Sequence, residues 1–212
     1  MNTTTKLAKT TDNNKAPTVT AGAFSLVIME KLINEIKKII LKNGRITIAI
    51  DGPCTSGKTT LANLLSAEFN AEVIHMDDFF LPFDMRTYER LSQAGGNVHY
   101  ERFVDEVVNG IKSGKSFVYG VFDCHTGNMS KPSPISPSEN IIIEGSYSLH
   151  PEISDDIYDL KIFLEVDTQT QLERILDRNG AEALEIFKSK WIPFENKYFE
   201  EFDIRSKCDI VL

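Results

Sequence analysis

The stretch RITIAIDGPCTSGKTTLANLL, which runs from Arg45 to Leu65, decides the fold. Its first part, Ile46–Ile50, is apolar and rich in β-branched residues, a composition typical of a buried strand. A glycine-rich segment follows at once, and from Thr60 to Phe69 apolar residues recur at helical spacing. The sequence therefore predicts a strand, a tight loop and a helix in immediate succession.

The loop between the strand and the helix fits the pattern G-x-x-x-x-G-K-[ST] at every fixed position. Glycines let consecutive backbone N–H groups turn toward one anion, and the N-terminus of the following helix adds its positive dipole. In such loops a lysine, here Lys58, meets the β- and γ-phosphates, and a hydroxyl, here that of Thr59, is a magnesium ligand. The residues expected at the nucleotide are Gly52, Pro53, Cys54, Thr55, Ser56, Gly57, Lys58, Thr59 and Thr60.

The composition is that of a soluble globular protein, with 42% hydrophobic and 25% charged residues among 212. A formal net charge of −8 argues against a nucleic-acid-binding surface, which needs a basic stripe. The cysteines Cys54, Cys124 and Cys208 have no metal-type spacing and indicate reduced thiols in a cytoplasmic compartment. No apolar stretch approaches the length of a transmembrane helix, so we expect no membrane partner.

The chain is predicted to divide near residue 29. Residues 1–28, of which the first twenty are rich in Thr, Asn and Lys, are expected to be a disordered N-terminal extension. The apolar run Ala21–Met29 is followed directly by charged residues and does not fit a signal peptide. Residues 29–212 are expected to form one domain that opens with an amphipathic helix over Met29–Lys42.

Short apolar segments alternate with helical patterns along the rest of the domain. Further strands are predicted at 71–76, 116–122, 140–143, 159–166 and 208–212, and helices at 100–111, 169–178 and 183–202. Such alternation is typical of a parallel sheet between two layers of helices. The sequence therefore predicts a three-layer α/β sandwich.

Carboxylates follow two of the predicted strands, at the sheet edge where α/β proteins bind ligands. Asp77 and Asp78 end one strand, and only one of them can readily face the loop because neighbouring side chains of an extended chain point opposite ways. Glu144 ends another strand, where a carboxylate contacts magnesium through water. The neighbouring Phe80 fits either the core or the wall of a site for a flat substrate.

Two further features have competing interpretations. His125 follows the strand predicted at 116–122 and is either functional or a satisfied surface or core group. Arg174 and Arg178 are four residues apart and share one helical face. They either clamp phosphate oxygens or solvate the helix while pairing with acidic neighbours, and the residues alone leave both questions open.

Several segments together carry a resemblance to a known family. They are GPCTSGKTT, HMDDFFLP, GGNVHYERF, YGVFDCH, IIIEGSYSLH and QLERILDRNG with WIPFENKYF. In this order, over about residues 46–212, they resemble the uridine kinase family of phosphate-loop nucleoside kinases. The resemblance implies an α/β fold of the three-layer α/β/α P-loop NTPase type, with a mostly parallel five-stranded sheet.

The resemblance also implies a phosphotransferase with an alcohol group as acceptor, which uses ATP (or GTP) with Mg²⁺. The implied acceptor is the 5′-hydroxyl of uridine or cytidine, and Asp77 matches the residue that takes its proton. The implied catalytic residues are Asp77, Lys58, Arg174 and Arg178; the metal ligands are Thr59, Asp77 and Glu144; and the acceptor-binding residues are Phe80, Phe122, Asp123 and His125.

The chain departs from the family pattern on the acceptor side. Phe122 stands where the family has a tyrosine, and His99 stands where an acidic acceptor-binding residue is expected. The lid after Arg178 is shortened to Asn179-Gly180. Another nucleoside, a vitamin riboside or a sugar is therefore an alternative acceptor.

Two other classes of nucleotide-binding protein are alternatives to a kinase. A GTPase would need N-K-x-D, and the chain has Asn196-Lys197-Tyr198-Phe199 without the aspartate. A non-catalytic nucleotide-binding regulatory protein is the stronger rival, because it would bind ATP without phosphorylating an acceptor. A homo-oligomer is also compatible with the sequence.

Overall fold

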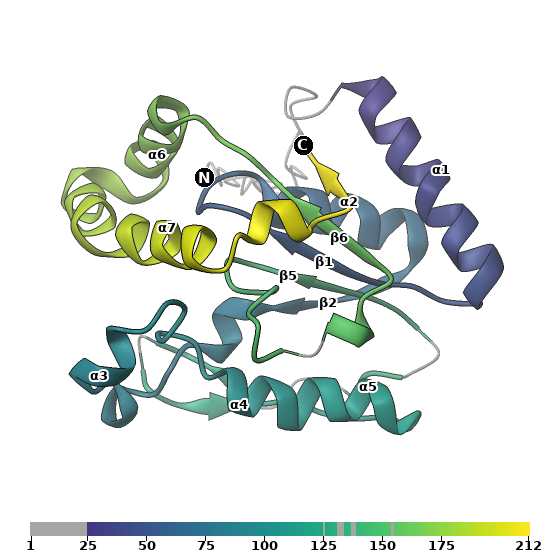
Figure 1. Cartoon of the computed structure of the whole chain (residues 1–212), viewed down its shortest axis with the longest axis horizontal. Coiled ribbons are helices and arrows are strands. Elements are labelled where there is room, and N and C mark those ends of the chain that lie inside the picture. Colours follow the sequence, from purple (N-terminus) through teal and green to yellow (C-terminus); the bar gives the residue numbers. More distant parts are fainter. Residues whose placement is uncertain (1–24, 125, 131–133, 137–138, 154) are drawn as a thin grey trace, which may run out of the picture.

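A parallel five-stranded sheet lies at the centre of the protein, in the strand order β2-β5-β1-β6-β7 (Figure 1). The computed structural model describes residues 25–124, 126–130, 134–136, 139–153 and 155–212. The strands are β1 (Thr47–Asp51), β2 (Ala71–His75), β5 (Asn140–Glu144), β6 (Leu160–Phe163) and β7 (Ile210–Val211). Every neighbouring pair is parallel. The α/β fold predicted from the sequence is therefore confirmed.

The register of the central strands brings their carboxyl ends to one edge. Ile50 in β1 pairs with Glu144 in β5 and with Ile162 in β6. Glu144 in turn pairs with His75, the last residue of β2. The segments that follow β1, β2 and β5 therefore leave the sheet side by side.

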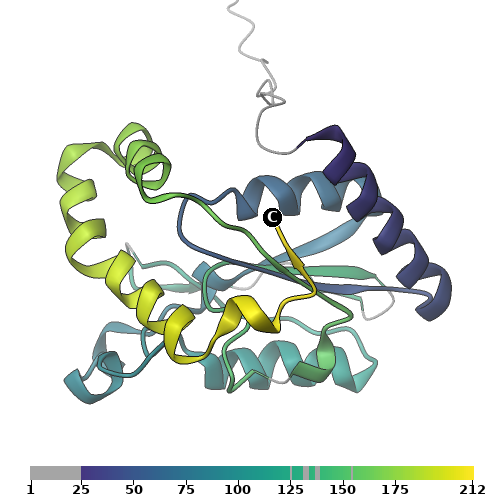
Figure 2. The same cartoon turned by 45° about the horizontal axis from the view of Figure 1, so that its top comes forward.

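Helices cover both faces of the sheet (Figures 1 and 2). One face carries α1 (Leu26–Asn43) and α2 (Lys58–Phe69); the other carries a continuous helical stretch of α4 (Tyr100–Phe103), the π-helix η3 (Val104–Val108) and α5 (Asn109–Ser113). Within β1, Ile48 and Ile50 belong to the buried cluster of α1 and α2, whereas Ala49 belongs to the opposite cluster. Because both faces are buried, the central strands read as continuous apolar runs rather than alternating ones.

The first helix begins earlier than predicted. Ser25 is its N-cap, and the Ser25 Oγ accepts a hydrogen bond from the Ile28 N–H at 3.3 Å. Gly44 ends it in the left-handed region, with a φ of 81°. The boundary predicted between residues 28 and 29 therefore falls inside α1 and is corrected by three residues. Residues 1–24 lie outside the described residues, so their disorder stays a prediction.

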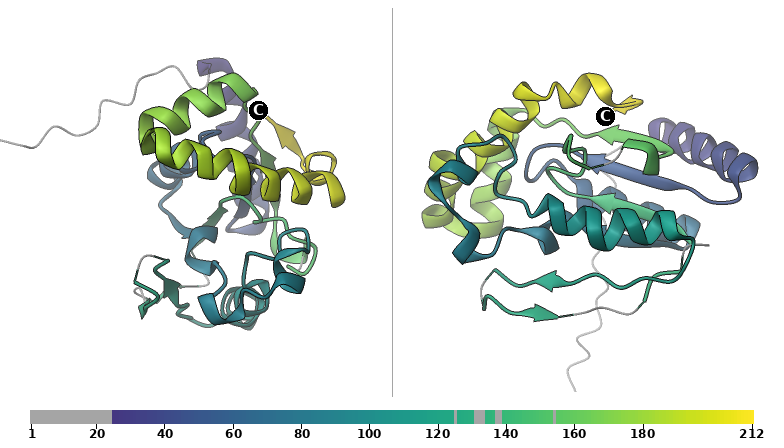
Figure 3. Two further views of the ribbon diagram at one scale, coloured as in Figure 1. Left: turned by 90° about the vertical axis from the view of Figure 1, so that its left-hand side faces the viewer. Right: turned by 60° about the horizontal axis from the view of Figure 1, so that its bottom comes forward.

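The C-terminal third forms a bent helical arm at the carboxyl edge of the sheet (Figures 1 and 3). It consists of α6 (Thr168–Ile186), the π-helix η5 (Phe187–Trp191) and α7 (Ile192–Glu201). The arm bends within α6 at Gly180, whose φ of 83° and ψ of 172° are not helical. The short helix η6 (Ile204–Lys207) then leads the chain into β7.

The strand predicted at 116–122 is wrong as a member of the main sheet. Only Val121–Phe122 is a strand there, β3, and it pairs antiparallel with β4 (Met129–Ser130) in a separate two-stranded sheet (Figure 3, right). The apolar residues of this segment pack on the helical layer instead, as Tyr119 does on Phe79, with ring centroids 5.4 Å apart. The apolar pattern correctly indicated burial but not the partner.

The remaining short elements connect the layers. They are the 3₁₀ helices η1 (Met76–Phe79), η2 (Phe83–Met85) and η4 (Asp155–Ile157), and the single turn α3 (Tyr88–Leu91). No helix among the described residues has the length and apolarity needed to cross a lipid bilayer.

Candidate active site

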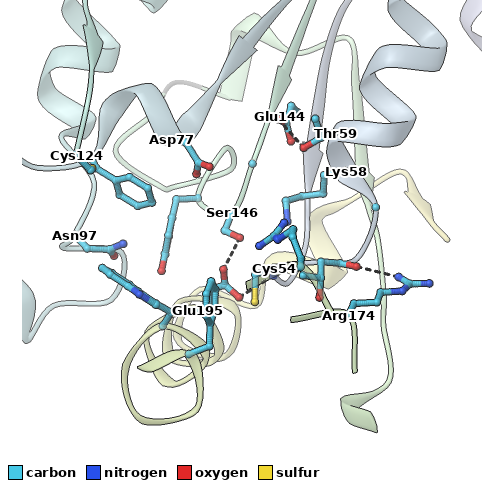
Figure 4. A pocket seen from close by; sticks show the side chains of 18 of the residues that line it. Cys54, Lys58, Thr59, Asp77, Asn97, Cys124, Glu144, Ser146, Arg174 and Glu195 are labelled. Atoms are coloured by element: carbon cyan, nitrogen blue, oxygen red, sulfur yellow. Dashed lines mark hydrogen bonds between the residues drawn. The ribbon is translucent and has the colours of Figure 1, made fainter. Parts of the chain in front are cut away.

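A cleft of about 640 Å³ opens at the carboxyl ends of β1, β2 and β5, next to the helical arm (Figure 4). Most of its lining comes from the loop after β1, the segment after β2, the turn after β5, and the arm of α6, η5 and α7, and Asn97 and Cys124 complete it. Its volume is in the range of small-molecule sites in enzymes. Most of the nucleotide-binding and catalytic residues predicted from the sequence line this cleft.

The loop Gly52–Gly57 turns tightly between β1 and α2. Gly52 has a φ of 139°, and a Cβ there would lie 2.3 Å from the Leu164 carbonyl oxygen, so only glycine fits. The helix α2 begins at Lys58 and directs its N-terminus into the loop. The Lys58 Nζ donates hydrogen bonds to the carbonyl oxygens of Gly52 and Pro53, both at 2.8 Å. The ammonium group is thus held inside the loop, at the cleft.

Thr59 and Glu144 meet directly across the sheet edge. The Thr59 hydroxyl donates a hydrogen bond to the Glu144 Oε1 at 3.1 Å, and the same oxygen lies 2.6 Å from the His75 Nδ1 (Figure 4). The hydrogen bond to Glu144 raises the pKa of His75. A hydroxyl and a carboxylate are the oxygen ligands that Mg²⁺ prefers, so this pair fits the predicted metal site.

Asp77 lines the cleft, whereas its neighbour Asp78 does not. The Asp78 carboxylate instead accepts a hydrogen bond from the Tyr119 hydroxyl at 3.3 Å. The two aspartates diverge as predicted, although the cause is the 3₁₀ turn of η1 rather than an extended strand. Partial desolvation in the cleft and then the charge of Glu144 raise the pKa of Asp77, while Lys58 opposes this shift.

Arg174 and Arg178 both line the cleft from α6. The Arg174 Nη1 donates a hydrogen bond to the Thr55 carbonyl oxygen of the loop at 2.9 Å, and the Arg178 Nε donates to the Asn179 Oδ1 at 2.8 Å. Among the described residues, neither arginine forms an ion pair with a carboxylate. This arrangement favours the phosphate clamp over the interpretation in which the arginines pair on the helix surface.

The structure separates the predicted acceptor-binding residues. Phe80 lines the cleft, with its ring centroid 6.2 Å from that of Trp191 in η5. Phe122 is buried outside the cleft, where it packs edge-on against Phe83. Asp123 is exposed and accepts a hydrogen bond from the Thr126 hydroxyl at 2.8 Å. His125 lies outside the described residues.

Glu195 of α7 is a buried cleft residue that sequence reasoning missed. Its carboxylate accepts hydrogen bonds from the Cys54 N–H and from the Ser146 hydroxyl, both at 2.9 Å (Figure 4). Burial and the charge of Glu195 raise the pKa of the Cys54 thiol to about 12, which keeps it protonated. A glutamate within an amphipathic helix has no local signature that would have identified this contact.

Asp51, the last residue of β1, holds the start of the same loop in place. Its fully buried carboxylate accepts hydrogen bonds from the backbone N–H groups of Gly52 and Leu149 and from the Tyr198 hydroxyl, at 2.7, 3.0 and 2.8 Å. Burial raises the pKa of Asp51 to about 6. Glu195 and Tyr198 therefore connect α7 to the loop at two points.

A family model described as "Phosphoribulokinase / Uridine kinase family" matches residues 47–183, which include the loop, Asp77, Glu144 and both arginines of α6. The chain belongs to this family. The resemblance to the family predicted from the sequence is therefore confirmed.

Individual members of the family are distant in sequence. The chain is 28% identical to a uridine kinase of Ureaplasma parvum over 173 residues, 76% of this chain and 84% of that protein. It is 23% identical to a phosphoribulokinase of Synechocystis over 141 residues, 65% of this chain but only 42% of that longer protein. A structure described as a "possible uridine kinase" from Bacillus stearothermophilus has the same fold, with a TM-score of 0.64 and 23% identity over 88% of this chain and 100% of that one.

Proposed function

We propose that the protein transfers the γ-phosphoryl group of ATP to a hydroxyl group of a small molecule, with Mg²⁺ as cofactor. One observation carries the proposal: Asp77 and the Lys58 loop line the same cleft, and both face its interior. A nucleotide-binding regulatory protein would need the loop but would not need a carboxylate placed opposite it. GTP remains the alternative donor.

The donor is proposed to bind across the loop. A second hollow of about 570 Å³ lies on the other side of the loop and shares Thr55, Gly57, Thr60 and Arg174 with the cleft. A nucleoside in this hollow would place its phosphate chain over the loop N–H groups and the N-terminus of α2. Lys58 and the two arginines of α6 would then surround the oxygens on which charge spreads during transfer.

Thr59 and Glu144, with Asp77 beside them in the same cleft, would hold the magnesium ion, which supplies charge neutralisation for the phosphate oxygens. Asp77 would orient the acceptor hydroxyl and accept its proton. Its raised pKa makes its carboxylate a stronger base than that of an exposed aspartate. The arm of α6, η5 and α7 lines one side of the cleft and would limit the access of water during transfer.

The acceptor proposed from the family resemblance is the 5′-hydroxyl of uridine or cytidine. Phe80 and Trp191 support a flat ring as part of the acceptor, because both line the cleft with their rings near each other. The place of Phe122 and Asp123 outside the cleft favours a second candidate, a kinase for another small hydroxyl compound. A cytoplasmic location, where ATP is abundant, fits either acceptor.

The experiment is a panel of acceptors incubated with ATP and Mg²⁺, with ADP formation measured and the products identified by mass spectrometry. The panel contains uridine, cytidine, purine nucleosides, a vitamin riboside and simple sugars. We expect ADP formation that depends on one class of acceptor and yields a product heavier by one phosphoryl group. Binding of ATP without a phosphorylated product from any acceptor would favour the regulatory protein.

A further inference from the structure

Arg86 follows η2 and lines the cleft with a guanidinium group that is held in place but not neutralised. Its Nε donates a hydrogen bond to the Leu81 carbonyl oxygen at 2.7 Å. The guanidinium carbon lies 4.5 Å from the centre of the Phe83 ring, a cation–π distance. These two contacts fix the orientation of the group, and the side chain is half-buried.

Among the described residues, Arg86 forms no ion pair with a carboxylate. The contrast with arginines outside the cleft is clear, because Arg90, Arg102 and Arg205 each pair with a glutamate. In the described part of the chain, the Arg86 Nη2 makes a long contact with the Cys124 Sγ, at 4.0 Å. A half-buried guanidinium group is partly desolvated, and no carboxylate that the structure describes compensates here for the lost hydration. An anion that enters the cleft would therefore bind it favourably.

Arg86 lies on the acceptor side of the cleft. Cys124, which it contacts, is placed beyond Asp77 as seen from Lys58 (Figure 4). The hollow on the far side of the loop does not include Arg86. In the proposed function, Lys58 and the two arginines of α6 bind the donor phosphates. Arg86 lies away from them and is therefore available to bind the acceptor.

We propose that Arg86 binds an anionic group of the acceptor, a phosphate or a carboxylate, while Asp77 receives a hydroxyl of the same molecule. This inference rests on the proposed kinase function and, of the two acceptor candidates named there, selects the second: a hydroxyl compound that carries a negative charge, in place of uridine or cytidine. Arginine suits this task because its planar fork of N–H groups matches both anions in two-point geometry. An uncharged nucleoside would leave the guanidinium without a partner.

The test compares matched acceptors that differ in charge. Ribose 5-phosphate is paired with ribose, and glycerate with glycerol, so that the two pairs separate a phosphate from a carboxylate as the bound group. Uridine completes the panel. We expect the kcat/KM of one charged compound to exceed that of its neutral partner by roughly tenfold or more. A factor of about ten corresponds to a single charge-assisted contact.

Arg86→Gln is the decisive variant, with Arg86→Lys beside it and Lys115→Gln as a control that removes one exposed positive charge outside the cleft. Arg86→Gln should lower the kcat/KM of the charged acceptor roughly 10- to 100-fold, mainly through KM, and so remove most of the preference for the charged acceptor over its neutral partner. Arg86→Lys should retain part of the preference because it keeps the charge but loses the fork. Thermal unfolding of all variants checks that they fold.

A binding measurement separates this inference from the proposed function. Calorimetry with ribose 5-phosphate or glycerate is performed on protein saturated with Mg²⁺ and a non-hydrolysable ATP analogue, so that the loop is already filled. Binding that is lost in Arg86→Gln, without phosphorylation of any acceptor, would support the anion site and contradict the kinase. The opposite result is that neutral acceptors are phosphorylated as well as charged ones and that Arg86→Gln changes neither turnover nor binding. This result would overturn the anion site and leave the proposed kinase function standing.

Discussion

The two halves of the cleft are built in different ways. The half proposed to bind the donor centres on one continuous segment, the loop and the first turn of α2, and adds Glu144 from the neighbouring strand and the two arginines of α6. The acceptor half is assembled from side chains far apart in the chain, such as Phe80, Arg86 and Trp191. A phosphate site can thus be fixed by local sequence, whereas the acceptor site depends on how distant segments pack. The predictions below test whether the two halves also separate in function.

The largest effect is expected from the donor half. Lys58→Ala removes the positive charge beside the transferring group, so phosphoryl transfer should fall by roughly 1,000-fold or more for every acceptor. Steady-state ADP formation measures it, with Lys115→Gln as a control for the loss of one surface charge. A loss confined to some acceptors would contradict a purely donor-side role.

The next largest effect is expected where the two halves meet. Asp77→Asn should lower kcat roughly 100- to 1,000-fold and change ATP affinity little, because the carboxylate acts on the acceptor proton. Asp78→Asn, one residue along, should be nearly silent in kcat because Asp78 does not line the cleft. Equal losses of turnover and ATP affinity in Asp77→Asn would remove Asp77 from the role of base.

The pH profile sharpens this prediction. A general base must be ionised to accept a proton, so the proposed role of Asp77 predicts that kcat/KM falls as the pH drops through its pKa. Because that pKa is raised, the acid limb should lie above the range of an ordinary aspartate and be absent from Asp77→Asn.

A smaller effect is expected at the metal. Glu144→Gln keeps the size of the side chain but removes its charge next to Thr59, so the Mg²⁺ concentration for half-maximal activity should rise roughly tenfold. Activity restored at high Mg²⁺ would show that the defect lies in metal binding. An unchanged Mg²⁺ requirement would exclude Glu144 from the metal site.

The smallest effect on turnover is expected in the acceptor half. Phe80→Ala should raise the KM for the acceptor several-fold, by roughly the value of one lost stacking contact, and leave the KM for ATP unchanged. Phe122→Ala should instead cost about 3 kcal/mol of unfolding free energy with little change in KM, because Phe122 is buried outside the cleft. The reverse result would return Phe122 to the acceptor site that the family resemblance implied.

The proposed donor half of the cleft was more predictable from the sequence than the proposed acceptor half. The Lys58 loop was predictable because its conformation is dictated by residues at fixed spacing, and a positive φ or close backbone approach requires glycine. The central strands were predictable because burial on both faces leaves continuous apolar runs. Their order and register arise from packing between distant segments, which no local pattern records.

The acceptor half shows where the prediction ended. The apolar residues of 116–122 were expected in the main sheet, yet Tyr119 and Phe122 are buried against the helical layer and Phe83. Period and hydrophobicity report burial but not the partner. Glu195 was missed for a related reason, since its contacts with the loop depend on the path of the arm after the bend at Gly180.

The central claim is that a hydroxyl oriented by Asp77 attacks a phosphoryl group held at the Lys58 loop. The most direct measurement uses ATP labelled in its γ-phosphoryl group and follows the label in the presence of the best acceptor of the panel. The account predicts that ADP and labelled phosphorylated acceptor form in equal amounts, and that neither forms at a comparable rate in Asp77→Asn. Label that appears only in inorganic phosphate, at a rate independent of the acceptor, would contradict it.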